Sequence, residues 1–193
     1  MIIRQVFTIT IILWCWVLNS QSILTGTLSK SSLTLRNDTP INIQLPENAE
    51  TIVKTAKELL IEDLKLCGFS NYTDDQKVRF QIIAGNINDP MIKKILSKNK
   101  INIQNIHAKW EHFLVKTFTT LNGKKLNGIL IIGSDPRGTA YGLMEISKLL
   151  GVSPWYYWAD VPVQKRDKIH IKANFEYEDG PKVKYRGIFI NDE

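Results

Sequence analysis

The chain has 193 residues, of which 44% are hydrophobic and 23% are charged, a composition typical of a globular protein that argues against disorder of the whole chain. The formal net charge is +6, yet the lysines are scattered, and no helix-turn-helix, zinc or RNA-binding signature accompanies them. We therefore expect no nucleic-acid partner. The charge is interpreted as a solvated surface, which is compatible with a weak attraction to acidic polysaccharides.

The first 22 residues have the order of a secretory signal peptide. Arg4 supplies a positive charge, residues 6–18 form an apolar run, and Ser20 and Ser22 have the small-x-small spacing of a cleavage site. The run is short for a membrane span, so we expect a secreted or periplasmic protein without stable membrane insertion. An uncleaved anchor is the alternative.

The next part of the chain predicts two strands and a helix. Residues 26–35 and 41–45 have the pattern of short strands on either side of a polar turn. Apolar side chains then recur at intervals of three and four through residues 49–64, which predicts a helix capped by Asn48 and ended by Gly68. The members of this stripe are Ala49, Ile52, Val53, Ala56, Leu59, Leu60 and Leu64.

Alternating strands and helices continue along the chain. Residues 78–85 predict a strand, and residues 89–100 predict a short helix with a proline in its first turn. Residues 112–120 and 126–134 predict two strands joined by an Asn-Gly turn, the second of them buried because its apolar run is continuous. This alternation predicts an α/β fold in which helices cover a mixed sheet.

The segment GSDPRG, residues 133–138, lies between the last of these strands and a further helix. Asp135 suits the N-cap, Pro136 the first helical position and Gly151 the residue after the helix. The segment matches neither the Walker pattern nor GxGxxG, so we interpret it as capping and turn chemistry and not as a phosphate-binding loop.

An aromatic run, PWYYWADVPV, occupies residues 154–163. Because prolines bracket it, we expect an irregular segment with little backbone pairing. Our first interpretation is that its rings pack at a junction between two domains. The second is that Tyr156, Trp158 or Asp160 contributes to the rim of a substrate pocket. Residues 168–178 then predict a strand, and residues 183–192 begin another.

No residue pattern predicts a metal, a cofactor or a nucleophile. His107 and His112 are five residues apart, and His170 lies in an alternating pattern, so none has a ligand spacing. Cys67 is the single cysteine once the predicted signal peptide is removed, which excludes an internal disulfide. It ends a helical pattern with no histidine near it in the sequence, so we expect a buried thiol.

Three motifs in order, GSDPRGTAYG, GVSPWYYWADVPV and YRGIFINDE, carry a family resemblance. From about residue 40 to its end, the chain resembles the N-terminal region of glycoside hydrolase family 115, the xylan α-glucuronidases. After the signal peptide predicted at 1–22, the resemblance implies a hexosaminidase-like N-terminal α/β domain at 23–175 and, at 176–193, the first strand of a truncated TIM barrel.

The resemblance also implies an activity. Enzymes of this family remove (4-O-methyl)glucuronic acid from glucuronoxylan, with inversion and without a metal. A complete barrel takes ~250 residues, whereas this chain contains at most one of its strands, so we expect a fragment that is inactive alone and leave its catalytic residues unassigned. A homodimer of the full-length protein stays open.

The expected substrate-binding residues lie at the end of the chain. Barrel active sites lie at the C-terminal ends of strands, so Asn191, Asp192 and Glu193 would face substrate if residues 185–190 form the first strand. Asp192 and Glu193 would point to opposite faces of that strand, so they are not expected to act as a catalytic pair with each other. Polar capping of the strand end is the alternative.

Two further polar positions have structural interpretations. Arg186 lies at the start of the presumed strand, away from the expected pocket. We therefore favour its pairing with an acidic residue, such as Asp160 or Glu178, over bidentate binding of a uronate. Glu111 follows Trp110 in a connection between a helix and a strand, where a packed indole is favoured over contact with a sugar.

Two functions compete with that of an enzyme fragment. In one, the α/β domain is a non-catalytic module that binds carbohydrate through its aromatic run. In the other, the chain is a non-functional gene fragment.

Overall fold

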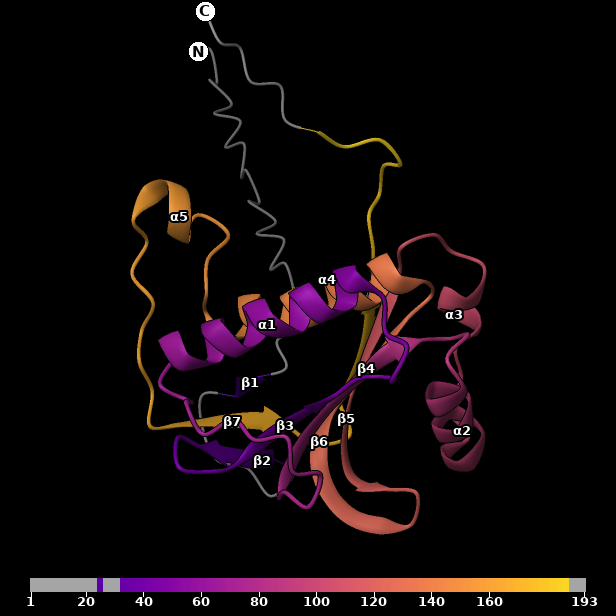
Figure 1. Ribbon diagram of the computed structural model, residues 1–193, viewed down its shortest axis with the longest axis horizontal. Coiled ribbons are helices and arrows are strands. Elements are labelled where there is room, and N and C mark those ends of the chain that lie inside the picture. Colours follow the sequence, from indigo (N-terminus) through magenta and orange to yellow (C-terminus); the bar gives the residue numbers. More distant parts are fainter. Residues whose placement is uncertain (1–23, 26–31, 188–193) are drawn as a thin grey trace, which may run out of the picture.

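The structure is a computed structural model that describes residues 24–25 and 32–187 (Figure 1). The predicted signal peptide at 1–22 and the predicted substrate-binding residues Asn191, Asp192 and Glu193 lie outside the described residues. Within the described ranges, no helix combines the length and the apolar character that crossing a bilayer requires.

The described residues form two sheets, which confirms the mixed α/β class. The larger has the order β3-β4-β6-β5-β8, with β3, β4 and β6 parallel and β5 antiparallel to both of its neighbours. The smaller is antiparallel, with the order β1-β7-β2. The strands are β1 (Leu24–Thr25), β2 (Ser32–Arg36), β3 (Ile41–Gln44), β4 (Phe80–Asn86), β5 (Phe113–Leu121), β6 (Lys124–Gly133), β7 (Lys168–Lys172) and β8 (Glu176–Asp179).

Helices cover both faces of the larger sheet (Figure 1). On one face, α1 and α4 pack against each other and against the sheet. On the other face lie α2 and α3. A short helix, α5, lies apart from the sheet within the aromatic run. The helices are α1 (Thr51–Leu66), α2 (Pro90–Asn99), α3 (Gln104–His107), α4 (Pro136–Leu150) and α5 (Tyr156–Ala159).

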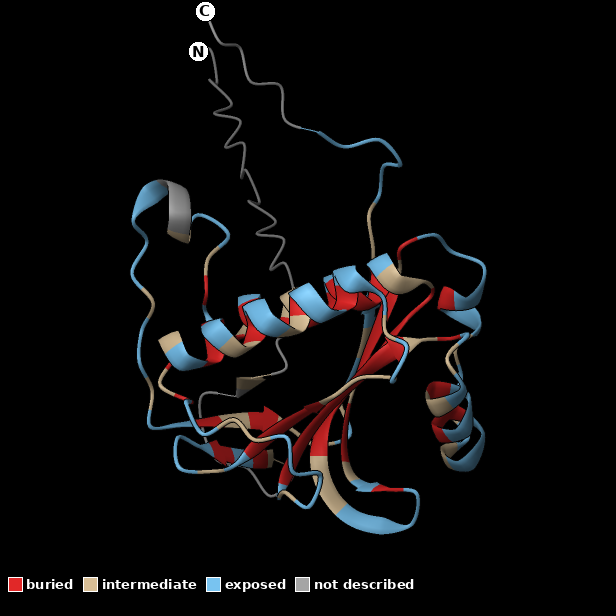
Figure 2. Ribbon diagram, viewed as in Figure 1, coloured by how far each residue is buried: buried red, intermediate tan, exposed pale blue. Residues whose placement is uncertain are grey.

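The central strand β6 explains why the chain has two hydrophobic clusters. Side chains alternate between the faces of a strand. Ile129 and Ile131 accordingly join the cluster under α1 and α4, whereas Leu130 and Ile132 join the cluster under α2 and α3. The continuous apolar run of this strand is therefore buried on both faces, as the sequence predicted (Figure 2).

Helix α1 differs in two respects from the prediction. It begins at Thr51, and the N-cap residue is Glu50, without a side-chain cap, so the predicted cap by Asn48 is wrong. Ile52 and Leu59 were assigned to the apolar stripe, yet they are 39% and 44% exposed. The stripe is wider than the face that α4 and the sheet cover, so its margins stay in water (Figure 2).

The two strands predicted on either side of the polar turn are present within the described residues as β2 and β3, which lie in different sheets because β2 joins β7 while β3 joins β4. The strand prediction at the other end of the domain needs correction. The single strand predicted at 168–178 is divided into β7 and β8 by a turn in which Asn174 has a φ of +53°. Strand β8 pairs with β5, so the domain's sheet continues past residue 175.

The predicted barrel strand is not formed in the described residues. Of the segment 183–192, the structure describes residues 183–187, which adopt no strand.

Cys67 is a fully buried free thiol, as predicted. Burial raises its pKa, with the Asp63 charge adding to the effect. The thiol is therefore held in its unreactive protonated form.

Replacing Leu143 tests the main core. Leu143 lies on α4 and is 0% exposed, so Leu143→Ala should lower the free energy of unfolding by about 2–5 kcal/mol. The matched control is Leu59→Ala, whose side chain is 44% exposed, and it should change that free energy by no more than about 0.5 kcal/mol. Urea denaturation followed by tryptophan fluorescence measures both. Equal losses would show that the outer face of α1 has been misassigned.

Candidate functional site

Asp135 joins two loops at the C-terminal end of β6. Its Oδ1 accepts a hydrogen bond from the Gly138 backbone N–H at 2.8 Å, which caps α4 as predicted. Its Oδ2 accepts one from the Glu111 N–H at 2.7 Å. A Cβ on Gly138 would lie 2.2 Å from the His112 carbonyl oxygen, so only glycine fits there. The GSDPRG segment thus holds the start of α4 against the connection between α3 and β5 by hydrogen bonds and close packing.

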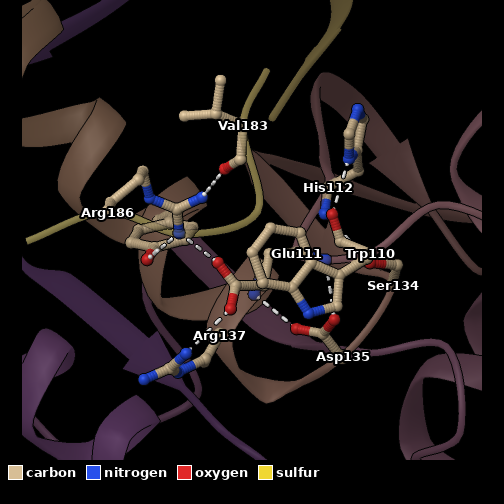
Figure 3. A network of polar contacts seen from close by, with 10 residues as sticks. Trp110, Glu111, His112, Ser134, Asp135, Arg137, Val183 and Arg186 are labelled. Atoms are coloured by element: carbon tan, nitrogen blue, oxygen red, sulfur yellow. Dashed lines mark hydrogen bonds and ion pairs between the residues drawn. The ribbon is translucent and has the colours of Figure 1, made fainter. Parts of the chain in front are cut away.

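The Glu111 side chain is the centre of a polar cluster (Figure 3). It is 1% exposed, and its backbone φ of +53° is unusual for a residue other than glycine. Its Oε1 lies 2.9 Å from Nη1 of Arg137, and its Oε2 accepts a hydrogen bond from Nη2 of Arg186. One buried carboxylate therefore holds two guanidinium groups.

These arginines determine the protonation of Glu111. Burial by itself would raise the pKa of the carboxyl group, but the hydrogen bonds and charges of Arg186 and Arg137 outweigh it and lower the pKa. Glu111 is therefore ionised at neutral pH and cannot act as a general acid there. Its position between Arg137 and Arg186 suits Glu111 to holding these two guanidinium groups in place.

Arg186 has contacts on several sides, although its side chain is 34% exposed. Its Nη1 donates to the Val183 carbonyl oxygen at 2.7 Å and its Nη2 to the Tyr141 hydroxyl at 2.9 Å. Its guanidinium carbon lies 5.1 Å from the centre of the Trp110 ring and 5.6 Å from that of Tyr141, within the range of cation–π attraction. The segment after β8 is thereby held against the start of α4.

The expectation that Arg186 pairs with an acidic residue is confirmed, but neither of the two residues named as examples, Asp160 and Glu178, is that partner. The actual partner, Glu111, lies 75 residues away in the sequence. The predicted packing of the Trp110 indole is confirmed only in part, because one face contacts the Arg186 guanidinium while Trp110 is 40% exposed. Arg137 was missed as a site residue.

A cleft of about 360 Å³ adjoins this cluster. It lies between α4 and the segment that follows β8, and Arg186 and Tyr141 line both the cleft and the cluster. Its carboxylates are Asp179 and Glu145, the latter 3.1 Å from Nζ of Lys148. Concave sites with a few polar groups among apolar ones are typical of small-ligand pockets.

The described residues include only part of the set predicted to bind substrate, so that set stays a prediction. Tyr156 is half-buried in α5 and does not line the cleft, although Pro154 does. Trp158 lies in α5, but the structure does not describe its side chain. Residues Asn191, Asp192 and Glu193 lie outside the described residues. Among the described residues, no three His, Cys, Asp or Glu side chains gather as a candidate metal site.

One sequence signal could have found part of the cluster. Arg137 and Tyr141 are four residues apart in PRGTAYG, which places them on one face of the helix. The sequence gives no comparable sign of Glu111, because its role depends on a contact between distant segments.

Glu111→Gln tests the ion pairs. At pH 7 it should lower the free energy of unfolding by about 1.5–3 kcal/mol, the loss typical of hydrogen bonds to a charged group. Folding lowers the pKa of Glu111. The stabilisation by its ionised carboxylate is therefore complete when the pH is above 4.5, the ordinary pKa of the group, and is lost as the pH falls through the lower pKa of the folded protein. The difference between the native protein and the variant should therefore shrink below pH 4.5.

The control for this prediction is Glu62→Gln. Glu62 pairs with Lys65 at 2.8 Å on the surface of α1, and removing such a pair should change the free energy of unfolding by about 0.5 kcal/mol. Urea denaturation at several pH values measures both variants. A Glu111→Gln protein as stable as the control would contradict a central role for this carboxylate.

The solved structures supply the comparison with known proteins, since no protein-family model and no curated protein matches the chain. A family GH115 4-O-methyl-alpha-glucuronidase with specificity for decorated arabinogalactans is 34% identical over 83% of this chain, with a TM-score of 0.69. The protein named CpGH84D is 15% identical over 77% of the chain, with a TM-score of 0.49. A chitobiase from Flavobacterium johnsoniae is 14% identical over 86%, with a TM-score of 0.45.

The matches cover only part of each known protein. The chain spans 20% of the GH115 enzyme, 22% of CpGH84D and 21% of the chitobiase. The likeness to the GH115 enzyme confirms what the three sequence motifs indicated: the chain resembles the N-terminal portion of a glycoside hydrolase of family GH115.

Proposed function

We propose that the chain is the N-terminal portion of a secreted glycoside hydrolase that removes (4-O-methyl)glucuronic acid from a polysaccharide. The observation that carries this proposal is the 34% identity to a GH115 4-O-methyl-alpha-glucuronidase over 83% of the chain, at a TM-score of 0.69. Secretion rests on the signal-peptide pattern of residues 1–22.

Two substrates are consistent with this proposal. Glucuronoxylan is the substrate that the sequence motifs favour. Decorated arabinogalactan is the second candidate, because the similar GH115 enzyme is described as specific for it. The uronic acid is the part that the two share, so the proposed substrate class is a polysaccharide with glucuronic acid side chains.

In this proposal the described α/β domain supports catalysis without performing it. Its most buried carboxylate, Glu111, is committed to Arg137 and Arg186 and has a lowered pKa. The general acid and base would come from a barrel that follows. The Glu111–Arg186 pair would fix the direction in which the chain leaves the domain toward that barrel.

The proposed substrate contacts remain those that the sequence indicated. Asn191, Asp192 and Glu193 would follow the first barrel strand, where amide and carboxylate groups can bind sugar hydroxyls. Tyr156 and Trp158 would contribute to the rim of the pocket.

A carbohydrate-binding module without activity is the second candidate function. The cleft of about 360 Å³ beside Arg186 favours it, because a pocket is present in the described residues without any barrel. Affinity electrophoresis in glucuronoxylan distinguishes the two: a retarded chain that contributes nothing to hydrolysis by the longer protein would support the module.

The activity test compares the 193-residue chain with the product of its full coding region. We expect the full product to release 4-O-methylglucuronic acid from glucuronoxylan or arabinogalactan, and the chain alone to release none. The measurement is chromatography of the released acid. Release by the chain alone, or by neither protein from either polysaccharide, would contradict the proposal.

Asp192→Asn in the full product tests the predicted pocket. Loss of a charged group that contacts substrate should lower kcat/KM by about tenfold or more, corresponding to about 1.4 kcal/mol. The control is Lys54→Gln, an exposed change on α1 that should leave kcat/KM unaltered. If Asp192→Asn behaves like the control, the placement of residues 191–193 in the pocket is wrong.

A further inference from the structure

A groove lies beside α2 and the β5–β6 turn, on the face of the larger sheet opposite to that covered by α4. Its volume is about 420 Å³. The lining combines three lysines, four amide side chains and several apolar side chains, with no carboxylate among them. These residues are Gln44, Gln76, Gln81, Ile83, Met91, Lys94, Ile95, Lys98, Leu121, Asn122, Lys124 and Leu126.

The lysines place uncompensated positive charge on both sides of the groove. Lys94 and Lys98 are one helical turn apart on α2, and Lys124 stands across from them at the start of β6. All three are exposed, and none forms an ion pair with a described residue. An anion in the groove would therefore meet cations from two separate elements.

Two amides that line the groove, those of Gln44 and Gln81, belong to a hydrogen-bonded chain that begins at the buried Asn42, outside the lining. Asn42 Nδ2 donates to the Thr73 carbonyl oxygen at 3.0 Å, which fixes Asn42 Oδ1 as an acceptor. Gln81 Nε2 donates to this oxygen at 3.2 Å and to Gln44 Oε1 at 3.1 Å. The backbone carbonyl thus determines which way each amide in the chain is turned.

This orientation leaves hydrogen-bonding groups for a ligand. Gln81 is 5% exposed, and no described residue donates to its Oε1. Likewise, no described residue accepts from Gln44 Nε2. At the far side, Asn122 Oδ1 accepts a hydrogen bond from Asn99 Nδ2 at 3.0 Å. The Asn122 side-chain nitrogen then points away from Asn99 and is a further donor for a ligand. Donors and an acceptor together suit hydroxyl groups, which both donate and accept.

We propose that this groove binds a segment of an anionic, uronate-bearing polysaccharide, with carboxylates at Lys94, Lys98 and Lys124 and hydroxyls at the amides. The inference takes its ligand class from the proposed function, but it concerns a surface separate from the Glu111 cluster and its cleft. A nucleic acid is disfavoured because no aromatic side chain lines the groove to stack on a base. A neighbouring hollow shares Gln44, Gln76 and Met91 with the groove. The carboxylates of Glu47 and Asp89 line that hollow, so the basic region is limited to one end of the groove.

The test is affinity electrophoresis of the chain in glucuronoxylan, in its carboxyl-reduced form and without polysaccharide. The unaltered chain should be retarded by glucuronoxylan and much less by the carboxyl-reduced form. The triple variant K94Q/K98Q/K124Q should bind glucuronoxylan about tenfold more weakly, because three exposed charge pairs are lost. Added salt should weaken binding of the unaltered chain more than that of the variant.

The matched control is K54Q/K168Q/K182Q. It removes the same charge from three exposed lysines that do not line the groove, so it should bind like the unaltered chain. Equal weakening of both triple variants would overturn the inference, since attraction would then follow net charge alone. Equal retardation by the carboxyl-reduced polymer, or tighter binding of single-stranded DNA at the same salt concentration, would also overturn it.

Failure of this inference and failure of the proposed function have different signatures. If the chain binds no polysaccharide, the groove is not a binding site. Release of uronic acid by the product of the full coding region would still support the proposed enzyme. Binding to the groove without such release would support the carbohydrate-binding module instead. Circular dichroism of both triple variants verifies that each is folded.

Discussion

The need to compensate one buried negative charge organises the functional end of this domain. A carboxylate as enclosed as that of Glu111 is strongly unfavourable without partners. Arg137 comes from α4 and Arg186 from the segment after β8, so neutralising Glu111 draws three distant parts of the chain together. Asp135 completes the arrangement by holding the Glu111 backbone and the start of α4 at the same time.

The polar cluster also shapes what surrounds it. With Arg186 held between Trp110 and Tyr141, the chain after β8 passes over α4 and closes one side of the cleft beside Glu145. In a longer glycoside hydrolase, the same contacts would set the direction in which the chain continues. The ion pairs thus have an architectural role in our proposal, and the chemistry of hydrolysis is assigned to residues that follow.

The two polar surfaces of the domain have different electrostatic characters. Around the cleft, cations and carboxylates are close enough to pair, as Lys148 and Glu145 do. In the groove beside α2, the lysines have no such partners, while the amides are oriented by a backbone carbonyl. Charge that the protein leaves uncompensated is available to a ligand, which is why the groove, and not the cleft, is our proposed site for an anionic polymer.

The sequence by itself determined the α/β class, the buried strand β6, helix α4 with its Asp135 cap, and the resemblance to family GH115. These features depend on residues within a few positions of one another, or on ordered motifs. The pairing of strands, the exposed margin of α1 and the partner of Arg186 were decided only by the tertiary structure. Each depends on which distant surface covers a segment, and a periodic pattern carries no information about that surface.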